Sequence, residues 1–289
     1  MIVISPEPPE PKVRWRMPLV STLLLICCFG EFSSGQPRSP LEDLPPNIRI
    51  LTHFGERAVW SPDGTRIAFI HRTLGDAFEI EIQSGEIRCL TCAFKNPGLF
   101  RIHYLPDGNY VLVGPPEVSD AENARWNESE IWVLKSDLSG PPIRLHQKLN
   151  EGIATSRLVP LIAWSESSNQ YPEKIPEGVS RLMVGKVEID EDVARLVEKR
   201  QVHEAKWPEC WLEAQDFRFG DSELIFSCYQ PENESEVMGV NLKTEMSSTI
   251  QTLPRFMMNL KESSRTANTR PSSAIFKMIK ATISLTSGN

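Results

Sequence analysis

The chain has 289 residues, of which 40% are hydrophobic and 24% are charged, a composition typical of a globular protein with a sizeable core. Its formal net charge is −7, and no segment concentrates Lys and Arg in the way that a phosphate backbone requires. The composition therefore excludes a typical nucleic-acid-binding protein, and we expect no nucleic-acid partner.

The N-terminal segment has the pattern of a secretory signal peptide. Cationic residues between positions 12 and 16 precede an apolar run from Met17 to Phe29, which is too short to cross a bilayer as a helix. We predict a signal peptide over residues 1–35 with cleavage before Gln36, followed by a linker over residues 36–49. An uncleaved signal anchor is the alternative. After cleavage the protein would be secreted and would retain no stable membrane span.

Secretion would place the remaining cysteines in an oxidising compartment, where disulfides are the default. The segment 211–228 reads as a hairpin, which places Cys210 and Cys228 nearly opposite each other on adjacent strands and predicts a disulfide between them. Cys89 and Cys92 are the second candidate pair, although a bridge that closes so short a loop constrains the unfolded chain little. A zinc site there would need two more clustered ligands, and no second Cys-x-x-Cys pair supplies them. We therefore predict no metal site.

Two Asn-x-Ser triplets begin at Asn127 and Asn233. Both are candidates for N-glycosylation, which agrees with passage through a eukaryotic secretory route.

Short β-type runs separated by turn residues dominate the chain after the linker, which favours an all-β fold. The clearest unit opens with a strand that ends at Trp60, whose side chain we expect to face the core. In the turn that follows, Pro62 presets φ, Asp63 can bond to the backbone two residues on, and Gly64 supplies the left-handed conformation. The alternating segment 79–82 then predicts a strand with one apolar face and one hydrated face.

A second copy of this unit carries its turn at Pro106, Asp107 and Gly108, and two fainter copies begin at Leu161 and Gln215. The spacing of roughly 45 to 60 residues suits one four-stranded blade for each copy. We assign both Asp63 and Asp107 to backbone hydrogen bonding rather than to catalysis, because they occupy the same turn position. The pattern predicts a β-propeller of four-stranded blades, about four of which are visible.

The first unit, from Trp60 to Phe69 with its closing Cys89-Leu90-Thr91, resembles the WD40-like (PD40) repeat of TolB-type six-bladed propellers. That repeat also occurs in the propeller domains of prolyl-oligopeptidase-like peptidases. The resemblance implies TolB-like blades over residues 50–253 and, because TolB-type relatives bind proteins, a protein ligand. Since the family's rings contain more blades than this chain shows, the resemblance also implies an incomplete propeller.

The tail over residues 254–289 departs from the repeat pattern. It is polar and poor in structure signals up to Ser273 and mildly apolar from Ile275 to Leu285. We expect a disordered terminus, with an amphipathic helix as the alternative. An incomplete propeller with such a tail would expose blade edges and apolar blade faces, so we expect self-association of residues 36–289.

The sequence contains no Gly-x-Ser-x-Gly elbow of the kind that a serine hydrolase of this type requires, and we expect no cofactor. Trp60, Trp132 and Trp164 fall in predicted strands, where aromatic side chains fill the core between blades. Trp207 and Trp211 flank a connection instead, so they are candidates for ligand contact.

These observations favour a secreted propeller scaffold that binds a protein or another extracellular ligand, with no catalytic constellation. The alternative function is the propeller portion of a prolyl-oligopeptidase-like hydrolase whose catalytic domain lies outside this chain.

Overall fold

The computed structural model describes residues 2–4, 44–117, 120–191 and 193–252, which fall into two units, Met1–Phe54 and Gly55–Asn289. In the first unit, β1 (Ile2–Ile4) pairs antiparallel with β2 (Ile48–Ile50). The apolar run and the cleavage position of the predicted signal peptide lie outside the described residues, and so does the tail over 254–289. The predictions made for them stay predictions.

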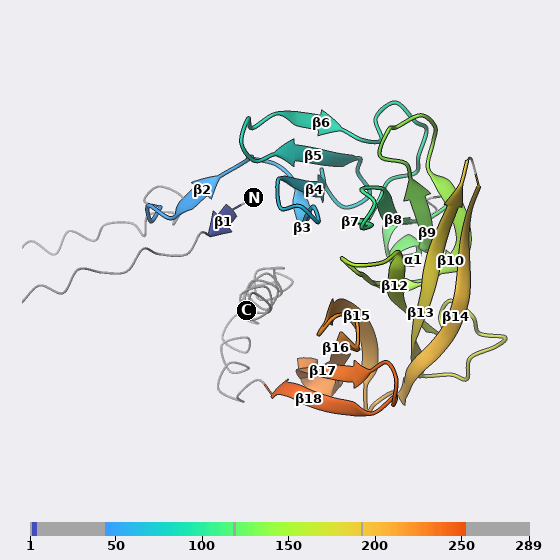
Figure 1. The fold of residues 1–289 in the computed structure, drawn as a ribbon. Helices are drawn as coiled ribbons and strands as arrows, with labels where there is room; N and C mark the ends of the chain where they lie inside the picture. The colour runs from blue at the N-terminus through green and yellow to red at the C-terminus, as the bar shows by residue number, and fades with distance from the viewer. Residues whose placement is uncertain (1, 5–43, 118–119, 192, 253–289) are drawn as a thin grey trace, which may run out of the picture. The chain divides into compact units, whose positions relative to one another are not determined.

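The second unit contains four antiparallel sheets of four strands each, which form the blades of a β-propeller (Figure 1). The prediction of an all-β propeller with four blades is confirmed. The blades comprise β3 (Glu56–Trp60), β4 (Arg66–Ile70), β5 (Ala77–Glu81) and β6 (Ile87–Cys89); β7 (Arg101–Tyr104), β8 (Tyr110–Gly114), β9 (Glu130–Leu134) and β10 (Ile143–Lys148); β11 (Asn150–Thr155), β12 (Leu161–Ser167), β13 (Val179–Asp190) and β14 (Val193–Lys206); and β15 (Trp211–Arg218), β16 (Glu223–Tyr229), β17 (Ser235–Asn241) and β18 (Ser247–Thr252). Among the described residues, helical structure is limited to α1 (Ala121–Asn123), the π-helical turn η1 (Ala124–Glu128) and the 3-10 turn η2 (Pro231–Asn233).

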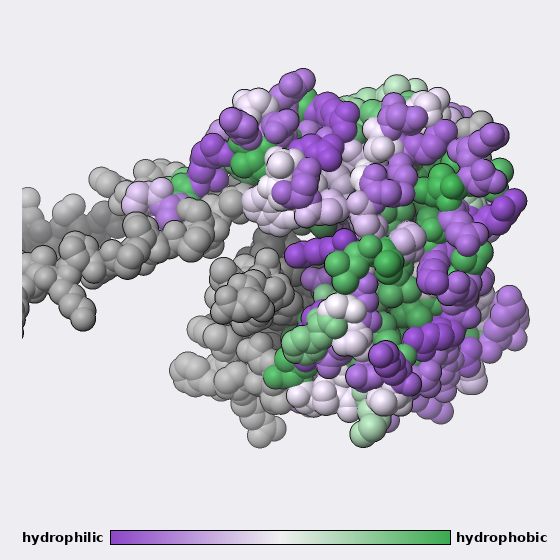
Figure 2. All heavy atoms as spheres, in the orientation of Figure 1, coloured by the Kyte–Doolittle hydropathy of each residue, from purple (hydrophilic) through white to green (hydrophobic). Residues whose placement is uncertain are grey.

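Each blade is a simple meander in which every strand pairs with the next one in sequence. The first strand of each blade lies innermost and the fourth lies at the periphery, as β3 and β6 show in Figure 1. The outer strand β14 of the third blade is largely exposed and polar, and Figure 2 shows many hydrophilic side chains along the periphery, with apolar ones among them. The middle strand β8 is instead buried along its whole length, because neighbouring blades cover both of its faces.

Three hydrophobic clusters join successive blades. The first two blades share Ala68, Ile70, Ile102 and Leu112; the second and third share Val111, Ile131, Ile162 and Trp164; the third and fourth share Leu182, Val184, Leu212, Leu224 and Phe226. Within the described ranges, no such cluster joins the fourth blade to the first. The apolar faces between consecutive blades are therefore the main core of this unit.

The three strand tryptophans differ in burial. Trp164 is completely buried and Trp132 packs against the cluster between the first two blades, as predicted. Trp60 is 43% exposed, so the prediction that it faces the core is wrong. The pairing of β3 with β4 shifts register between Glu56 and Val59, and Val59 is the residue that packs against the second blade. Trp60, next in sequence, consequently points to the other face of the sheet.

Candidate functional site

The two ends of the propeller carry different connections. Because successive strands are antiparallel, loops between first and second strands and between third and fourth strands all lie at one end, which we call the turn face. Loops between second and third strands, together with the links between blades, lie at the opposite end, which we call the linker face. This topology places both disulfides, both Asn-x-Ser triplets and the two flanking tryptophans at the linker face.

The turn face carries the six predicted turn residues. Asp63 Oδ1 accepts hydrogen bonds from Ser61 Oγ at 2.5 Å and from the Thr65 amide at 3.1 Å, and Gly64 has a φ of 71°. These bonds, that from Ser61 foremost, lower the pKa of Asp63 to about 2.

In the second turn, which begins at Pro106, Asp107 accepts from the Asn109 amide at 3.0 Å, and Gly108 has a φ of 87°. Each Asp carboxylate thus accepts hydrogen bonds from residues of its own turn. Pro62 and Pro106 precede these aspartates and begin the turns.

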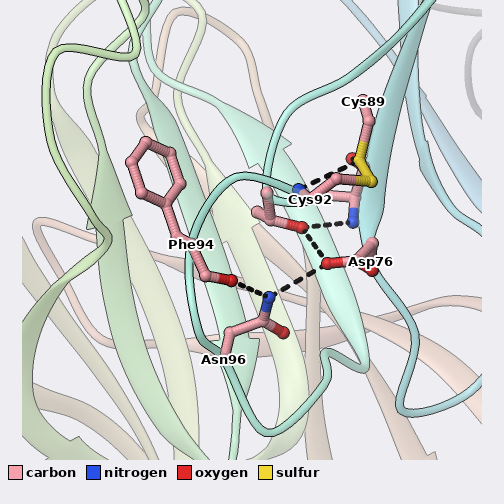
Figure 3. Close-up of a disulfide and its surroundings, with 7 residues drawn as sticks. Asp76, Cys89, Cys92, Phe94 and Asn96 are labelled. Atoms are coloured by element: carbon pink, nitrogen blue, oxygen red, sulfur yellow. Dashed lines mark hydrogen bonds between the residues drawn. A yellow bond between two sulfur atoms is a disulfide. The ribbon is translucent and has the colours of Figure 1, made fainter.

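Both predicted cysteine pairs lie at disulfide-bonding distance. Cys89 and Cys92 have Cα atoms 5.8 Å apart, at the end of β6 and in the link to the second blade (Figure 3). Cys210 and Cys228 have Cα atoms 5.2 Å apart and join the link before β15 to the end of β16. In the second pair, Cys228 faces Leu212 in the strand register, so the expected hairpin brings Cys210 beside it. Each bridge therefore fixes a link at the linker face.

Trp207 and Trp211 lie in and after the second of these links. Trp207 is 44% exposed, and its amide donates to the Gly178 carbonyl at 2.8 Å. Trp211 is partly buried and pairs with Tyr229 across β15 and β16. Of the two predicted contact residues, Trp207 is therefore the more exposed to solvent.

A second exposed indole, Trp126 in η1, was missed from the sequence. It is 39% exposed, and the Arg125 guanidinium stacks 4.7 Å from its ring centre. The Trp126 carbonyl accepts a hydrogen bond from Gln170 Nε2, in the loop 168–178 between β12 and β13. That loop ends at Gly178, which holds Trp207. Trp126 and Trp207 therefore each contact this loop through their backbone atoms, and we call Trp126, the loop 168–178 and Trp207 the aromatic surface.

The loop within the aromatic surface is concave and internally braced. A pocket of about 310 Å³ is lined by Ser168, Asn169, Pro172, Ile175 and Glu177. Gln170 is itself buried, and its Oε1 accepts from the amide and hydroxyl of Ser167 at 2.8 Å each. A pocket on a braced loop that two exposed tryptophans contact suits binding of another molecule.

The two Asn-x-Ser triplets border the same face. Asn127 follows Trp126 directly, is half-buried, and donates from its Nδ2 to Asn123 Oδ1 at 2.7 Å. Ser129 of that triplet is buried and donates to the Ala124 carbonyl at 2.9 Å. Attachment of a glycan to Asn127 would therefore have to precede formation of this turn. Asn233 ends η2, between β16 and β17.

The innermost strands meet through an ion pair near the linker face. Arg101 Nη2 on β7 lies 3.5 Å from Glu213 Oε1 on β15, and Tyr229 donates to Glu213 Oε2 at 2.6 Å. Burial, followed by the Glu213 charge, raises the pKa of Tyr229. Gly152 on β11 permits this approach, since a Cβ there would collide with Glu213 Cγ. The pair joins the second blade to the fourth, which are not neighbours in the ring order.

A buried carboxylate lies between the first two blades. Glu79 on β5 is 3% exposed, and its Oε2 accepts hydrogen bonds from Tyr104 at 2.7 Å and from Tyr110 at 2.8 Å. Arg88 lies 2.8 Å from the carboxylate and Arg66 lies 3.5 Å from it. Burial alone would raise the pKa of Glu79, but the two tyrosine hydrogen bonds and the two arginine charges outweigh burial and lower it.

The prediction of a hydrated face for this strand is wrong at Glu79. The two tyrosines of the second blade cover the face that carries it, while Glu81 stays exposed. Burial, aided by the hydrogen bond to Glu79, raises the pKa of Tyr110 to about 12 and also raises that of Tyr104. Since partners from both blades satisfy one carboxylate, this cluster holds the two blades together.

No helix in the part of the chain that the structure describes is long and apolar enough to cross a membrane.

The chain matches no family model and no curated protein. Among solved structures it is similar to a TolB from Agrobacterium tumefaciens, with a TM-score of 0.51, 15% identity, and coverage of 71% of this chain and 66% of that one. The blades share the TolB propeller fold. TolB from Acinetobacter baumannii gives a TM-score of 0.46 with 12% identity over 71% of this chain and 46% of that chain. A prolyl endopeptidase structure gives a TM-score of 0.46 with 12% identity over 70% of this chain and 30% of that chain.

The chain thus spans between about half and two thirds of the length of these TolB proteins. The likeness establishes the fold of the blades. The number of blades in the TolB-type resemblance and its WD40-like repeat stay predictions.

Proposed function

We propose that the chain is a secreted β-propeller scaffold that binds a protein partner through the aromatic surface of its linker face. The observation that carries the proposal is that two exposed tryptophans, Trp126 and Trp207, both contact one braced loop that carries a pocket. Tryptophan is the residue type most enriched among the side chains that dominate binding energy at protein interfaces.

The surroundings of the aromatic surface support the same function. The disulfide between Cys210 and Cys228 anchors the link that carries Trp207, and Gln230 Nε2 donates to the Glu209 carbonyl of that link at 3.2 Å. A surface whose loops are held in place before binding loses less conformational entropy when a partner docks. Disulfides also fit an oxidising, extracellular location.

The test uses the full chain expressed with a C-terminal tag in a eukaryotic secretory cell line. Proteins crosslinked to it in the medium are identified, and the affinity of the recovered partner is then measured for wild type, Trp126→Ala, Trp207→Ala and Phe219→Ala. Phe219 is the control because it is 73% exposed and lies at the turn face. Each tryptophan variant should weaken binding at least tenfold, whereas the control should not change it.

Unchanged affinity in both tryptophan variants would place the binding surface elsewhere. Retention of the chain inside the cell would contradict secretion. Loss of a mobility shift on enzymatic deglycosylation in Asn127→Gln or Asn233→Gln would identify the modified asparagine.

Self-association belongs to the same proposal. The fourth and first blades lack a shared hydrophobic cluster among the described residues, so residues 36–289 should form dimers or larger species. Size-exclusion chromatography with light scattering decides the point, and a sharply melting monomer would overturn it.

The alternative is that this chain is the propeller portion of a prolyl-oligopeptidase-like hydrolase. That alternative predicts that the same transcript also encodes a catalytic domain. Transcripts that continue in frame past Asn289 into a Gly-x-Ser-x-Gly segment would favour it.

A further inference from the structure

Three metal-ligating side chains converge beside the first disulfide. One carboxylate oxygen of Asp76 and the sulfurs of Cys89 and Cys92 all lie within 4.8 Å of one another. Asp76 precedes β5 and Cys89 ends β6, and the pairing of Phe78 with Cys89 in this hairpin brings them together. Figure 3 shows the carboxylate next to the sulfur bridge.

The Asp76 carboxylate is held in a fixed orientation. Its Oδ1 accepts hydrogen bonds from Thr91 Oγ1 at 2.7 Å and from Asn96 Nδ2 at 3.0 Å. Thr91 is completely buried, and its hydroxyl in turn accepts from the Ala77 amide at 3.0 Å. Asn96 Oδ1 accepts from the Gly98 amide at 2.9 Å. Outer partners of this kind orient the carboxylate ligands of metal sites.

The cluster opens to solvent. A pocket of about 300 Å³ is lined by His71, Arg72, Asp76, Cys92, Lys95 and Asn96. Cys92 is exposed, whereas Cys210 and Cys228 of the other disulfide are only 5% and 3% exposed. A reductant and an ion can therefore reach the first bridge far more readily than the second.

We propose that Asp76, Cys89 and Cys92 form a redox-gated site for a thiophilic divalent cation such as Zn²⁺. A dithiol reductant supplies two electrons and two protons, which break the sulfur–sulfur bond to give two thiols, and the reductant becomes a cyclic disulfide. The cation then displaces both thiol protons and binds two thiolates and one carboxylate oxygen, and water takes the fourth position toward the pocket.

The types of the three ligands and the sequence spacing of the two cysteines agree with this assignment. Cys-x-x-Cys is the spacing with which zinc is commonly bound by two thiolates, and tetrahedral zinc accepts sulfur and carboxylate ligands together. The oxidised state blocks both sulfurs, so the site would bind the cation only after reduction. The sequence-based expectation of no metal at this pair considered only Cys and His ligands, and Asp76 supplies a third.

The experiment uses the full chain with Cys27→Ser and Cys28→Ser in every sample, so that thiols arise only from the two described pairs. Stepwise reduction with dithiothreitol, followed by alkylation and mass spectrometry, should modify Cys89 and Cys92 before Cys210 and Cys228. Anaerobic titration of the reduced protein with Co²⁺ should then give thiolate-to-metal absorption with a stoichiometry of one, and none in the oxidised protein.

Variants test whether these residues bind the metal ion or only stabilise the fold. Cys92→Ser should remove the thiolate absorption or reduce it by at least half. Asp76→Asn, whose amide oxygen can still accept from Thr91, should weaken Co²⁺ binding at least tenfold. Asp107→Asn at the turn face is the matched control and should bind as wild type does. Circular dichroism of each oxidised variant shows whether the blades are intact.

Three results would overturn the proposal: no absorption from the reduced protein, wild-type Co²⁺ affinity in a folded Asp76→Asn, or opening of the buried bridge first. None of these depends on the protein partner, so the two proposals fail separately.

Discussion

The interface between the first two blades and the interface between the last two solve the same packing problem with different chemistry. The first combines an apolar cluster with the buried carboxylate of Glu79, which two tyrosine hydroxyls and two guanidinium groups surround. The second is an apolar cluster centred on side chains such as Phe226 and Leu182, with one disulfide at its edge. Both interfaces are filled by apolar side chains, and the first adds directional hydrogen bonds to a buried charge, so the two should respond to different perturbations.

The largest expected effect is at the apolar interface. Phe226→Ala should lower the free energy of unfolding by about 3–5 kcal/mol, because it removes a completely buried ring and leaves a cavity between two blades. Urea unfolding measures the change. Phe219→Ala serves as the control and should shift stability by less than about 0.5 kcal/mol, since its ring is exposed. Equal shifts would contradict the account of the core.

A smaller loss is expected at the polar interface. Glu79→Gln keeps the shape of the side chain but removes the charge that its four partners share, which should cost about 2–3 kcal/mol. We take a value below that of a fully buried ion pair because Arg66 and Arg88 are partly exposed and can hydrate. The loss is measured by urea unfolding at neutral pH. A neutral result would show that the apolar cluster and the tyrosine rings hold this interface without the charge of Glu79.

Acid should weaken the polar interface. The pKa of Glu79 is lower in the folded state than its ordinary value of 4.5, so its contribution is complete above about pH 4.5 and is lost as pH falls toward the folded pKa. The wild-type protein should therefore lose more stability between pH 6 and pH 3 than Glu79→Gln does. The difference between these two losses should not exceed the loss of stability that the substitution causes at neutral pH. Identical pH profiles would show that Glu79 does not titrate in this range.

The smallest effect concerns the turns that lead into the polar interface. Asp63→Ala should cost about 1 kcal/mol, because it removes hydrogen bonds to Ser61 and Thr65 next to Arg66. Asp107→Ala removes bonds only to Asn109 and should cost less. Thermal unfolding of both variants tests the ranking, and the reverse order would mean that the first turn does not help to position Arg66.

The turn chemistry explains how far the sequence predicts the fold. The Pro-Asp-Gly turns mark the first two blades directly, because only a few residue types adopt these backbone conformations. The third blade lacks that signal, and the length of β13 and β14, 12 and 14 residues, was not predicted. The sequence of β14 is rich in charge because the strand lies at the outer edge, so its hydrophobic alternation is weak.

The candidate sites were predicted less completely than the fold. Trp207 could be found because it lies in a connection between strands, whereas Trp126 lies in a π-helical turn that no periodicity marks. Asp76 and Cys89 are 13 residues apart and meet only through the register of one hairpin. The Ser84-Gly85 turn could have given that register, since Gly85 has a φ of 75° and closes a short loop.

The ion pair between Arg101 and Glu213 has a consequence for cooperativity. It connects the second blade to the fourth, and Gly152 of the third blade leaves room for the contact. These three blades are therefore held together by this ion pair in addition to the interfaces between consecutive blades. Among the described contacts, the first blade is joined to the rest through the second. Native-state hydrogen exchange should therefore show β4 and β5 opening at a lower free energy than β8, β12 and β16, which would exchange together as one unit.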